Sequence, residues 1–286
     1  MSKSKLQLIL SMVVFGSIGI FVKYINLPSE IIAMIRGLIG SVILIVIGTL
    51  TGRKIDFPAI KKNLPILLIS GTAMGFNWIL LFEAYRYIDV SLATLCYYLA
   101  PVFVIIASPF VIKEKTNAVK VAATFISLGG MVLVSGVLNV EQTVNYTGIL
   151  LGIGAAILYA TVMLMSKFLK DISSDDSTIV RLGVAGIAVG IYSAFTQDIL
   201  SLRPDIVSVI LVLFVAVVHT GITYKMYFSA MGELPTQTVA IYSYIDPVVS
   251  IILSIVILSE SFGVIELIGS VMILGSTLAC ELWGNK

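Results

Sequence analysis

Apolar runs of about twenty residues recur along the whole chain, and this recurrence limits its possible folds more than any other feature. A helix rises about 1.5 Å per residue, so such a run crosses a hydrocarbon core of about 30 Å. The chain has 58% hydrophobic and 12% charged residues and a mean hydropathy of +1.07. An average soluble domain has about 25% charged residues. The sequence therefore predicts an all-α integral membrane protein.

Charges, proline and glycine breaks, and run length divide the chain into ten expected transmembrane helices. We expect them at 6–24, 30–51, 64–86, 91–111, 118–137, 146–167, 177–197, 205–229, 236–258 and 263–282. The longest connection is expected at 52–63. The first run follows Lys3 and Lys5, as in a signal peptide, but continues to Tyr24 without a small-residue cleavage site. We therefore expect a retained first helix.

Lysine and arginine divide unevenly between the two sides of this arrangement, with twelve on one side and three on the other. The richer side holds Lys3, Lys5, Arg53, Lys54, Lys61, Lys62, Lys113, Lys115, Lys120, Lys167, Lys170 and Lys286, and the poorer side holds Lys23, Arg86 and Arg203. Cytoplasmic loops of helical membrane proteins carry the excess of basic residues. We therefore expect the N- and C-termini in the cytoplasm.

A segment at 82–129 recurs at 228–275 with a constant offset of 146 and no gap. The matched pairs include Phe82/Phe228, Ala84/Ala230, Tyr98/Tyr244, Pro101/Pro247, Val102/Val248, Glu114/Glu260 and Gly129/Gly275. Shared apolar composition does not readily place a Tyr-x-x-Pro-Val motif, a glutamate and a glycine in one register. We interpret the chain as an internal duplication with repeats at 1–140 and 141–286.

The duplication predicts an inverted repeat. Each half contains five expected helices, an odd number, so the second half enters the membrane from the opposite side. Two halves related by a pseudo-two-fold axis in the membrane plane can open a central site to either side in turn. The sequence therefore indicates a carrier that works by alternating access.

The residues of the duplicated segment also resemble a known family. The motifs are Phe82-Glu83-Ala84, Tyr-Tyr-Leu-Ala-Pro-Val at 97–102 and Glu114, echoed by Phe228-Ser229-Ala230, Ser-Tyr-Ile-Asp-Pro-Val at 243–248 and Glu260. This pattern is similar to the EamA-type proteins of the drug/metabolite transporter superfamily, over essentially the whole chain. The resemblance implies ten helices in two inverted halves, and mostly prokaryotic inner-membrane exporters or exchangers of amino acids and other small metabolites. It also implies a basic residue in the second helix of each half, where Arg36 and Arg181 stand. Glu83 departs from the family pattern, in which small or neutral residues are commoner.

Two prolines, Pro101 and Pro247, lie within the fourth and ninth expected helices. A proline inside a helix cannot donate to the carbonyl four residues earlier, so we expect the carbonyls of Tyr97 and Ser243 to lose a partner. This pattern favours a hinge or a broken-helix ligand site, and the alternative is a tolerated kink.

Polar aromatic residues gather around these prolines and in the third and eighth expected helices. Such rings supply apolar area with one polar group each, which suits a small organic ligand. The candidate substrate-binding residues are Asn77, Trp78, Tyr97, Tyr98, Thr223, Tyr224, Tyr242 and Tyr244. The alternative for this set is a packed helix interface with satisfied hydroxyl groups.

Four ionisable residues within expected spans are candidates for coupling or counter-charge, namely Asp246, Glu83, Lys225 and His219. Asp246 could bind a proton or cation, or could cap backbone freed by the next proline. His219 could titrate during transport, or stay neutral and bond to a neighbouring helix. Glu83 and Lys225 differ in height by roughly 20 Å, so they cannot pair directly. Each could line a vestibule or extend to the interface.

Arg36 and Arg181 are expected to anchor helices or satisfy carbonyls rather than touch substrate. Small residues at 129–130 and 275–276 permit close helix approach, either inside one chain or in a homodimer.

These observations predict a secondary transporter of small organic metabolites. The family resemblance alone implies that it is an exporter or exchanger, that amino acids are among the substrates, and that it lies in the bacterial cytoplasmic membrane. Its partners are the small-molecule substrate and the lipid bilayer. A net charge of +2 argues against nucleic acid, and the lack of a P-loop pattern argues against ATP drive. One histidine and scattered acids do not form an enzyme's constellation, so we expect no metal, cofactor or catalytic residue. The alternatives are a non-transporting membrane sensor or scaffold and, less favoured, an intramembrane enzyme.

Overall fold

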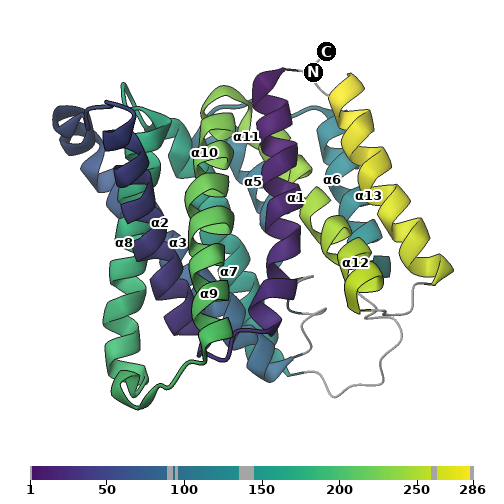
Figure 1. Cartoon of the computed structure of the whole chain (residues 1–286). Helices are drawn as coiled ribbons and strands as arrows, with labels where there is room; N and C mark the ends of the chain where they lie inside the picture. The colour runs from purple at the N-terminus through teal and green to yellow at the C-terminus, as the bar shows by residue number, and fades with distance from the viewer. Residues whose placement is uncertain (1, 89–92, 94–95, 135–144, 259–262, 284–286) are drawn as a thin grey trace.

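The structure is a computed structural model that describes residues 2–88, 93, 96–134, 145–258 and 263–283 (Figure 1). Every regular element in these ranges is a helix. Six helices of the described residues are long and apolar enough to cross a membrane. Large apolar side chains also cover the outer surface, including Leu50, Phe110 and Phe195, which are more than four-fifths exposed. An all-helical chain with such a surface fits the expected integral membrane protein.

The helices follow one another in chain order. In the first half they are α1 (Lys3–Lys23), α2 (Ser29–Leu50), α3 (Phe57–Tyr87), α5 (Ala100–Val111) and α6 (Ala118–Val134). In the second half they are α7 (Tyr146–Met165), η2 (Ser166–Phe168), α8 (Ser174–Thr196), η3 (Ile199–Ser201), α9 (Ile206–Phe214), η4 (Val215–Ile222), α10 (Thr223–Glu233), α11 (Thr236–Tyr242), α12 (Ile245–Leu258) and α13 (Val264–Trp283). Glu260 and Lys286 lie outside the described residues.

Helix α3 begins earlier than the sequence predicted. The side chain of Asp56 accepts the backbone N–H of Ala59 at 2.9 Å, which satisfies a free donor of the first turn. The expected connection at 52–63 is therefore wrong, and the connection is confined to 51–56. The lysines at 61–62 suggested a loop, but they lie exposed on the first turns of the helix.

The helices that carry the two prolines are each interrupted. One interruption lies at 98–99, directly before α5, and the other at 243–244, between α11 and α12. Pro101 and Pro247 consequently fall in the first turn of the following helix, where a missing N–H costs no helical hydrogen bond. The prolines therefore begin new helices instead of bending continuous ones.

Backbone carbonyls at these interruptions have hydrogen-bond partners that the sequence did not predict. The Ser243 carbonyl accepts the backbone N–H of Asp246 at 3.3 Å, so the expectation that it lacks a partner is wrong. The Tyr244 hydroxyl donates to the Tyr98 carbonyl at 3.1 Å and joins the two broken helices. A carbonyl in a membrane interior needs such a partner.

Helices α9, η4 and α10 form one continuous rod, and η4 is a π-helix. Its wider turn leaves carbonyls that threonine side chains satisfy: Thr220 donates to the Val215 carbonyl at 3.2 Å and Thr223 to the Val218 carbonyl at 2.7 Å. Segments of this kind occur frequently at functional sites.

Close helix pairs hold the bundle together. Helix α2 packs along α8, α3 along α7 and α8, α6 along α13, and α1 against α10 and α12 (Figure 1). A Cβ added at Gly37 would lie 2.6 Å from the backbone nitrogen of Gly186, and one added at Gly130 would lie 2.6 Å from the Gly269 carbonyl oxygen. Ser127 and Ser276 Oγ atoms lie 2.7 Å apart in the α6–α13 contact. Small residues therefore serve helix packing within this chain.

Candidate functional site

An aromatic cluster lies where the two interrupted helices meet α1, α3, α7 and α10. We call it the central cluster, and its members are Phe15, Trp78, Tyr97, Tyr98, Tyr159, Tyr224, Tyr227 and Tyr244. The two halves of the chain contribute equal numbers of these rings.

Stacked rings join the interruptions to the rest of the cluster. Tyr97 stacks on Tyr159 with ring centroids 5.3 Å apart and an interplanar angle of 9°. Tyr98 stacks on Tyr244 at 5.9 Å and 30°, and the Tyr97 and Tyr98 rings are 5.6 Å apart. Tyr97, directly before the first interruption, thus contacts α7, and Tyr98, within it, contacts the second interruption.

Hydroxyl groups form a second set of contacts within the central cluster. The Tyr159 hydroxyl lies 3.0 Å from the Tyr227 hydroxyl and 3.3 Å from Ser243 Oγ. Trp78 Nε1 donates to the Tyr224 hydroxyl at 3.3 Å. Groups that both donate and accept can exchange these partners for those of a small polar ligand.

One basic and one acidic side chain border the central cluster. The buried Arg36 donates through Nε to Thr220 Oγ1 at 3.0 Å, and its Cζ lies 4.9 Å from the Trp78 ring centroid. Asp246, in the first turn of α12, accepts a hydrogen bond from the Tyr98 hydroxyl. Both charges interact electrostatically with the Tyr224 hydroxyl. The cluster therefore lies between a guanidinium and a carboxylate.

Three other predicted binding residues lie nearby with different contacts. Asn77 donates through Nδ2 to the Ala155 carbonyl at 2.6 Å, which joins α3 to α7, and it also donates to the Tyr97 hydroxyl. Thr223 donates to the rod in which it lies, and Tyr242, the last residue of α11, is buried in the main hydrophobic core of the bundle. The structure thus groups Trp78 with the predicted tyrosines at 97, 98, 224 and 244, and places these three beside them.

His219 lies in η4 on the side that faces α1. Its Nε2 is 3.0 Å from Ser17 Oγ, and its ring packs against Phe21 and Phe214 at 4.9 and 5.6 Å. Nδ1 has no hydrogen-bond partner among the residues described. This hydrogen bond to α1 is the contact expected if His219 is a neutral imidazole bonded to a neighbouring helix.

Lys225 and Glu83 lie outside the central cluster. Lys225 Nζ is 3.1 Å from Asp175 Oδ2, at the end of the bundle where α8 begins. Arg53 binds the same carboxylate at 3.3 Å and Asp176 at 3.2 Å. Glu83 is partly exposed near the end of α3.

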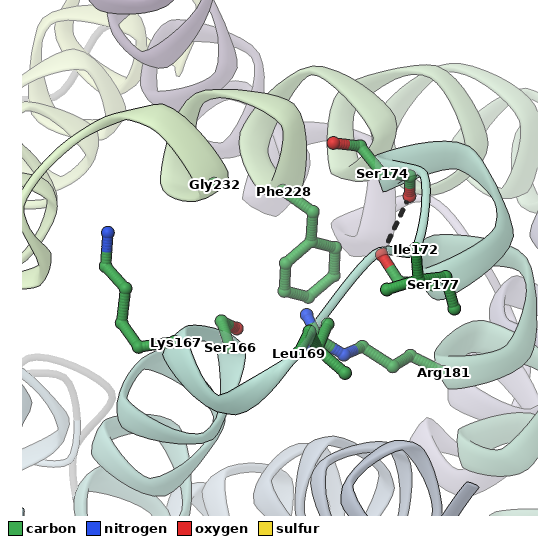
Figure 2. A pocket seen from close by; sticks show the side chains of 9 residues that line it. All are labelled: Ser166, Lys167, Leu169, Ile172, Ser174, Ser177, Arg181, Phe228 and Gly232. Carbon is green, nitrogen blue, oxygen red and sulfur yellow. Dashed lines mark hydrogen bonds between the residues drawn. The ribbon is translucent and has the colours of Figure 1, made fainter. Parts of the chain in front are cut away.

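Arg181 repeats the arrangement of Arg36 in the other half. It donates through Nε to Ser70 Oγ at 3.1 Å, and its Cζ lies 4.3 Å from the Phe228 ring centroid. Each arginine thus binds a hydroxyl from the other half and covers a ring from its own half. Arg181 also borders a pocket of about 190 Å³ at the end of α7 (Figure 2).

Residues that sequence reasoning missed, although they contact the predicted ones, include Phe15, Tyr159, Thr220 and Tyr227. A signal existed for three of these: Phe15 and Tyr159 occupy aligned positions of the two halves at an offset of 144. Tyr227 follows Tyr224 by three residues and shares its helix face. The described residues contain no group of three or more His, Cys, Asp or Glu that could hold a metal ion.

Comparison with known proteins agrees with the resemblance seen in the sequence. Residues 3–136 and 146–280 each match the EamA-like transporter family. "Uncharacterized transporter YxxF" of Bacillus subtilis (strain 168) is 28% identical over 281 residues, which cover 95% of this chain and 87% of that protein. "Uncharacterized transporter YoaV" of the same organism is 22% identical over 252 residues, covering 87% and 85%.

A solved structure described as "Crystal structure of protein" superposes with a TM-score of 0.88. It is 16% identical in sequence, and the match covers 98% of this chain and 99% of that one. At this identity the likeness concerns the fold alone.

Proposed function

Since the chain belongs to the EamA-like transporter family, we propose that it is a secondary transporter of small organic metabolites such as amino acids. We further propose that it works by alternating access, as an exporter or exchanger. The family and the names of its relatives indicate a transporter rather than an enzyme.

The observation that carries this proposal is the central cluster between Arg36 and Asp246. An amino acid has a carboxylate and an ammonium group on one carbon, and these would bind the guanidinium and the carboxylate respectively. The tyrosine rings between the two charges would pack against the side chain and donate or accept hydrogen bonds.

Helix packing supports ten spans in two inverted repeats at 1–140 and 141–286. In this arrangement α1, α2, α3, α5 and α6 correspond to α7, α8, the α9–α10 rod, α12 and α13. Exchange of the halves converts the α1–α10 contact into α7–α3, α1–α12 into α7–α5, and α2–η4 into α8–α3. The α2–α8 and α6–α13 contacts convert into themselves, and all of these contacts are present. The two separate family matches support the same division.

The interruptions at 98–99 and 243–244 are the proposed hinges, with Pro101 and Pro247 at the start of the moving segments. A small number of residues between helices can absorb a large change in backbone angles. The hydrogen bond between Tyr244 and Tyr98 links the two interruptions, so their motions would be coupled.

We place the protein in the bacterial cytoplasmic membrane with both termini in the cytoplasm. The uneven distribution of basic residues supports this orientation. Helix α1 begins and α13 ends at the same end of the bundle (Figure 1). The relatives described above are bacterial.

A ligand-dependent thermal shift on purified protein tests the proposal. A ligand that binds the folded state alone raises the apparent stability. We expect a saturable rise for at least one member of a panel of amino acids, amines and organic acids, and counterflow of that compound in proteoliposomes. Binding without flux would favour a non-transporting sensor, and the absence of both would contradict the proposal.

A further inference from the structure

A polar pocket of about 190 Å³ lies where α7 ends and α8 begins (Figure 2). Nine residues line it: Ser166, Lys167, Leu169, Ile172, Ser174, Ser177, Arg181, Phe228 and Gly232. The volume corresponds to about six water molecules at about 30 Å³ each, which is enough for a carboxylate or phosphate group.

The guanidinium of Arg181 forms the inner wall of this pocket. Arg181 is completely buried, yet its Nη1 and Nη2 have no hydrogen-bond partner in the part of the chain that the structure describes. Nε donates to Ser70, and the planar group lies against the Phe228 ring, so its orientation is fixed. Figure 2 shows the nitrogen atoms beside Phe228 and Leu169, at the pocket wall.

A buried cation without partners is energetically costly, because nothing replaces the water it has lost. Two terminal nitrogens in one plane match the two oxygens of a carboxylate or phosphate. Arg181 therefore offers two coplanar N–H donors without partners among the described residues, to which a small oxyanion could bind.

The charges around the pocket favour an anion. Its lining contains two basic residues, Arg181 and Lys167, and no acidic one. Lys167 already donates through Nζ to the Leu234 carbonyl, so it contributes mainly its charge. Four acids adjoin lining residues in sequence. Asp171, Asp175 and Asp176 are bound to the basic side chains of Lys62, Arg53 and Lys225, and Glu233 accepts a hydrogen bond from Ser4. Glu114 interacts electrostatically with Lys167 from outside the lining.

The pocket adjoins the central cluster and shares no lining residue with it. The Phe228 ring lies 5.7 Å from the Tyr224 ring and 5.3 Å from the Tyr227 ring, and the Arg181 guanidinium lies against it. Arg181 also interacts electrostatically with the Tyr227 hydroxyl. Phe228 therefore stands between the pocket and the cluster.

We propose that this pocket binds the oxyanion group of a carboxylate or phosphate compound through the Nη1 and Nη2 atoms of Arg181. The site goes beyond the transport function proposed above, since it uses none of the central-cluster hydroxyls. The oxyanion can come from a soluble metabolite or from the headgroup of an anionic lipid, and both would bind by the same chemistry.

Thermal shifts measured in neutral detergent, without phosphate or added lipid, test this inference. One arm titrates sodium phosphate and sodium acetate against sodium chloride at matched ionic strength. The other arm titrates short-chain phosphatidylglycerol against phosphatidylcholine. We expect a saturable rise in melting temperature in at least one arm, and the arm that responds identifies the source. No saturable rise in either arm would overturn the proposal.

Variants assign the effect to the pocket. Arg181→Gln removes the cation, and we expect about tenfold weaker binding or more, as for loss of charge-assisted hydrogen bonds. Arg203→Gln, on the exposed connection between η3 and α9, is the matched control and should titrate like the wild type. Should Arg181→Gln fail to fold, Lys167→Gln removes the second lining charge and should weaken binding several-fold. Wild-type binding by a folded lining variant would overturn the proposal.

Central-cluster variants separate this inference from the transport proposal. Asp246→Asn should bind phosphate or lipid at the pocket as the wild type does. Loss of anion binding in Asp246→Asn would place the anion in the central cluster and refute a separate site.

Discussion

Replacement of Gly37 by alanine tests whether small residues determine the approach of α2 to α8. The added Cβ would lie 2.6 Å from the nitrogen of Gly186, 2.7 Å from its Cα and 2.9 Å from the Leu182 carbonyl oxygen. All three atoms belong to the backbone, which cannot rotate away as a side chain can. Restoring ordinary contact distances of 3.4 Å or more requires α2 and α8 to separate by about 1 Å. Alanine at position 37 therefore overpacks the contact between these helices.

The size of the effect follows from two opposing terms. Overpacking costs about 1–3 kcal/mol, while replacing glycine inside a helix contributes up to about 1 kcal/mol in favour of alanine. With the middle of the overpacking range, about 2 kcal/mol, the net loss is about 1–2 kcal/mol, which corresponds to a melting temperature lower by about 2–8 °C. Gly19→Ala is the matched control, because a Cβ there meets nothing within 4 Å.

The assay is thermal unfolding of the purified variants in one detergent, followed by tryptophan fluorescence or by aggregation. We expect Gly37→Ala to melt below the wild type and Gly19→Ala to melt at or slightly above it. A Gly37→Ala protein that melts at or above the wild type would show that α2 and α8 are not in the described contact.

Three further changes test other contacts. Tyr244→Phe removes the hydroxyl that joins the interrupted helices, and should cost about 1 kcal/mol in unfolding measurements and change the counterflow rate. Lys225→Gln breaks a partly exposed ion pair with Asp175, and should cost less than about 1 kcal/mol while flux persists, since Lys225 lies outside the central cluster. The hydrogen bond from the Ser208 backbone N–H holds the pKa of the Asp205 carboxyl below its ordinary 3.8 in the folded protein. The capping bond therefore contributes its full stability at pH values above 3.8. This contribution is lost as the pH falls through the lower pKa of the folded state. Asp205→Ala should therefore melt below the wild type at pH 6, and the difference should vanish in strong acid.

Each of these three predictions has a distinct refuting result. Wild-type stability and flux in Tyr244→Phe would show that its hydroxyl is not used. Loss of flux in folded Lys225→Gln would give Lys225 a role in transport rather than in the ion pair. A constant difference between Asp205→Ala and the wild type across the pH range would refute the capping argument.

Repeat analysis predicted several residues that the structure brings together. Trp78 and Tyr224, and Tyr98 and Tyr244, are equivalent pairs at an offset of 146, and each pair is joined by a hydrogen bond. In the proposed inverted repeat, equivalent positions near the pseudo-two-fold axis would lie close together, which accounts for these two contacts.

Other features could not be read from the sequence, because they depend on packing. The π-helical turns around His219 do not change the apolar periodicity enough to be recognised in one sequence. The start of α3 at Phe57, after the cap Asp56, was not predicted, because the lysines of its first turns suggested a connection. The unpaired nitrogens of Arg181 follow from what surrounds the residue, and a helix-anchoring interpretation of Arg181 was the natural one from sequence position alone.

The central claim is that substrate binds between Arg36 and Asp246. Counterflow of a labelled substrate by Arg36→Gln and Asp246→Asn proteoliposomes tests it most directly, with Arg203→Gln and Asp198→Asn as exposed controls. Loss of one charge-assisted interaction should reduce uptake by about tenfold or more, while both controls transport like the wild type. Wild-type uptake by folded Arg36→Gln and Asp246→Asn would contradict the claim.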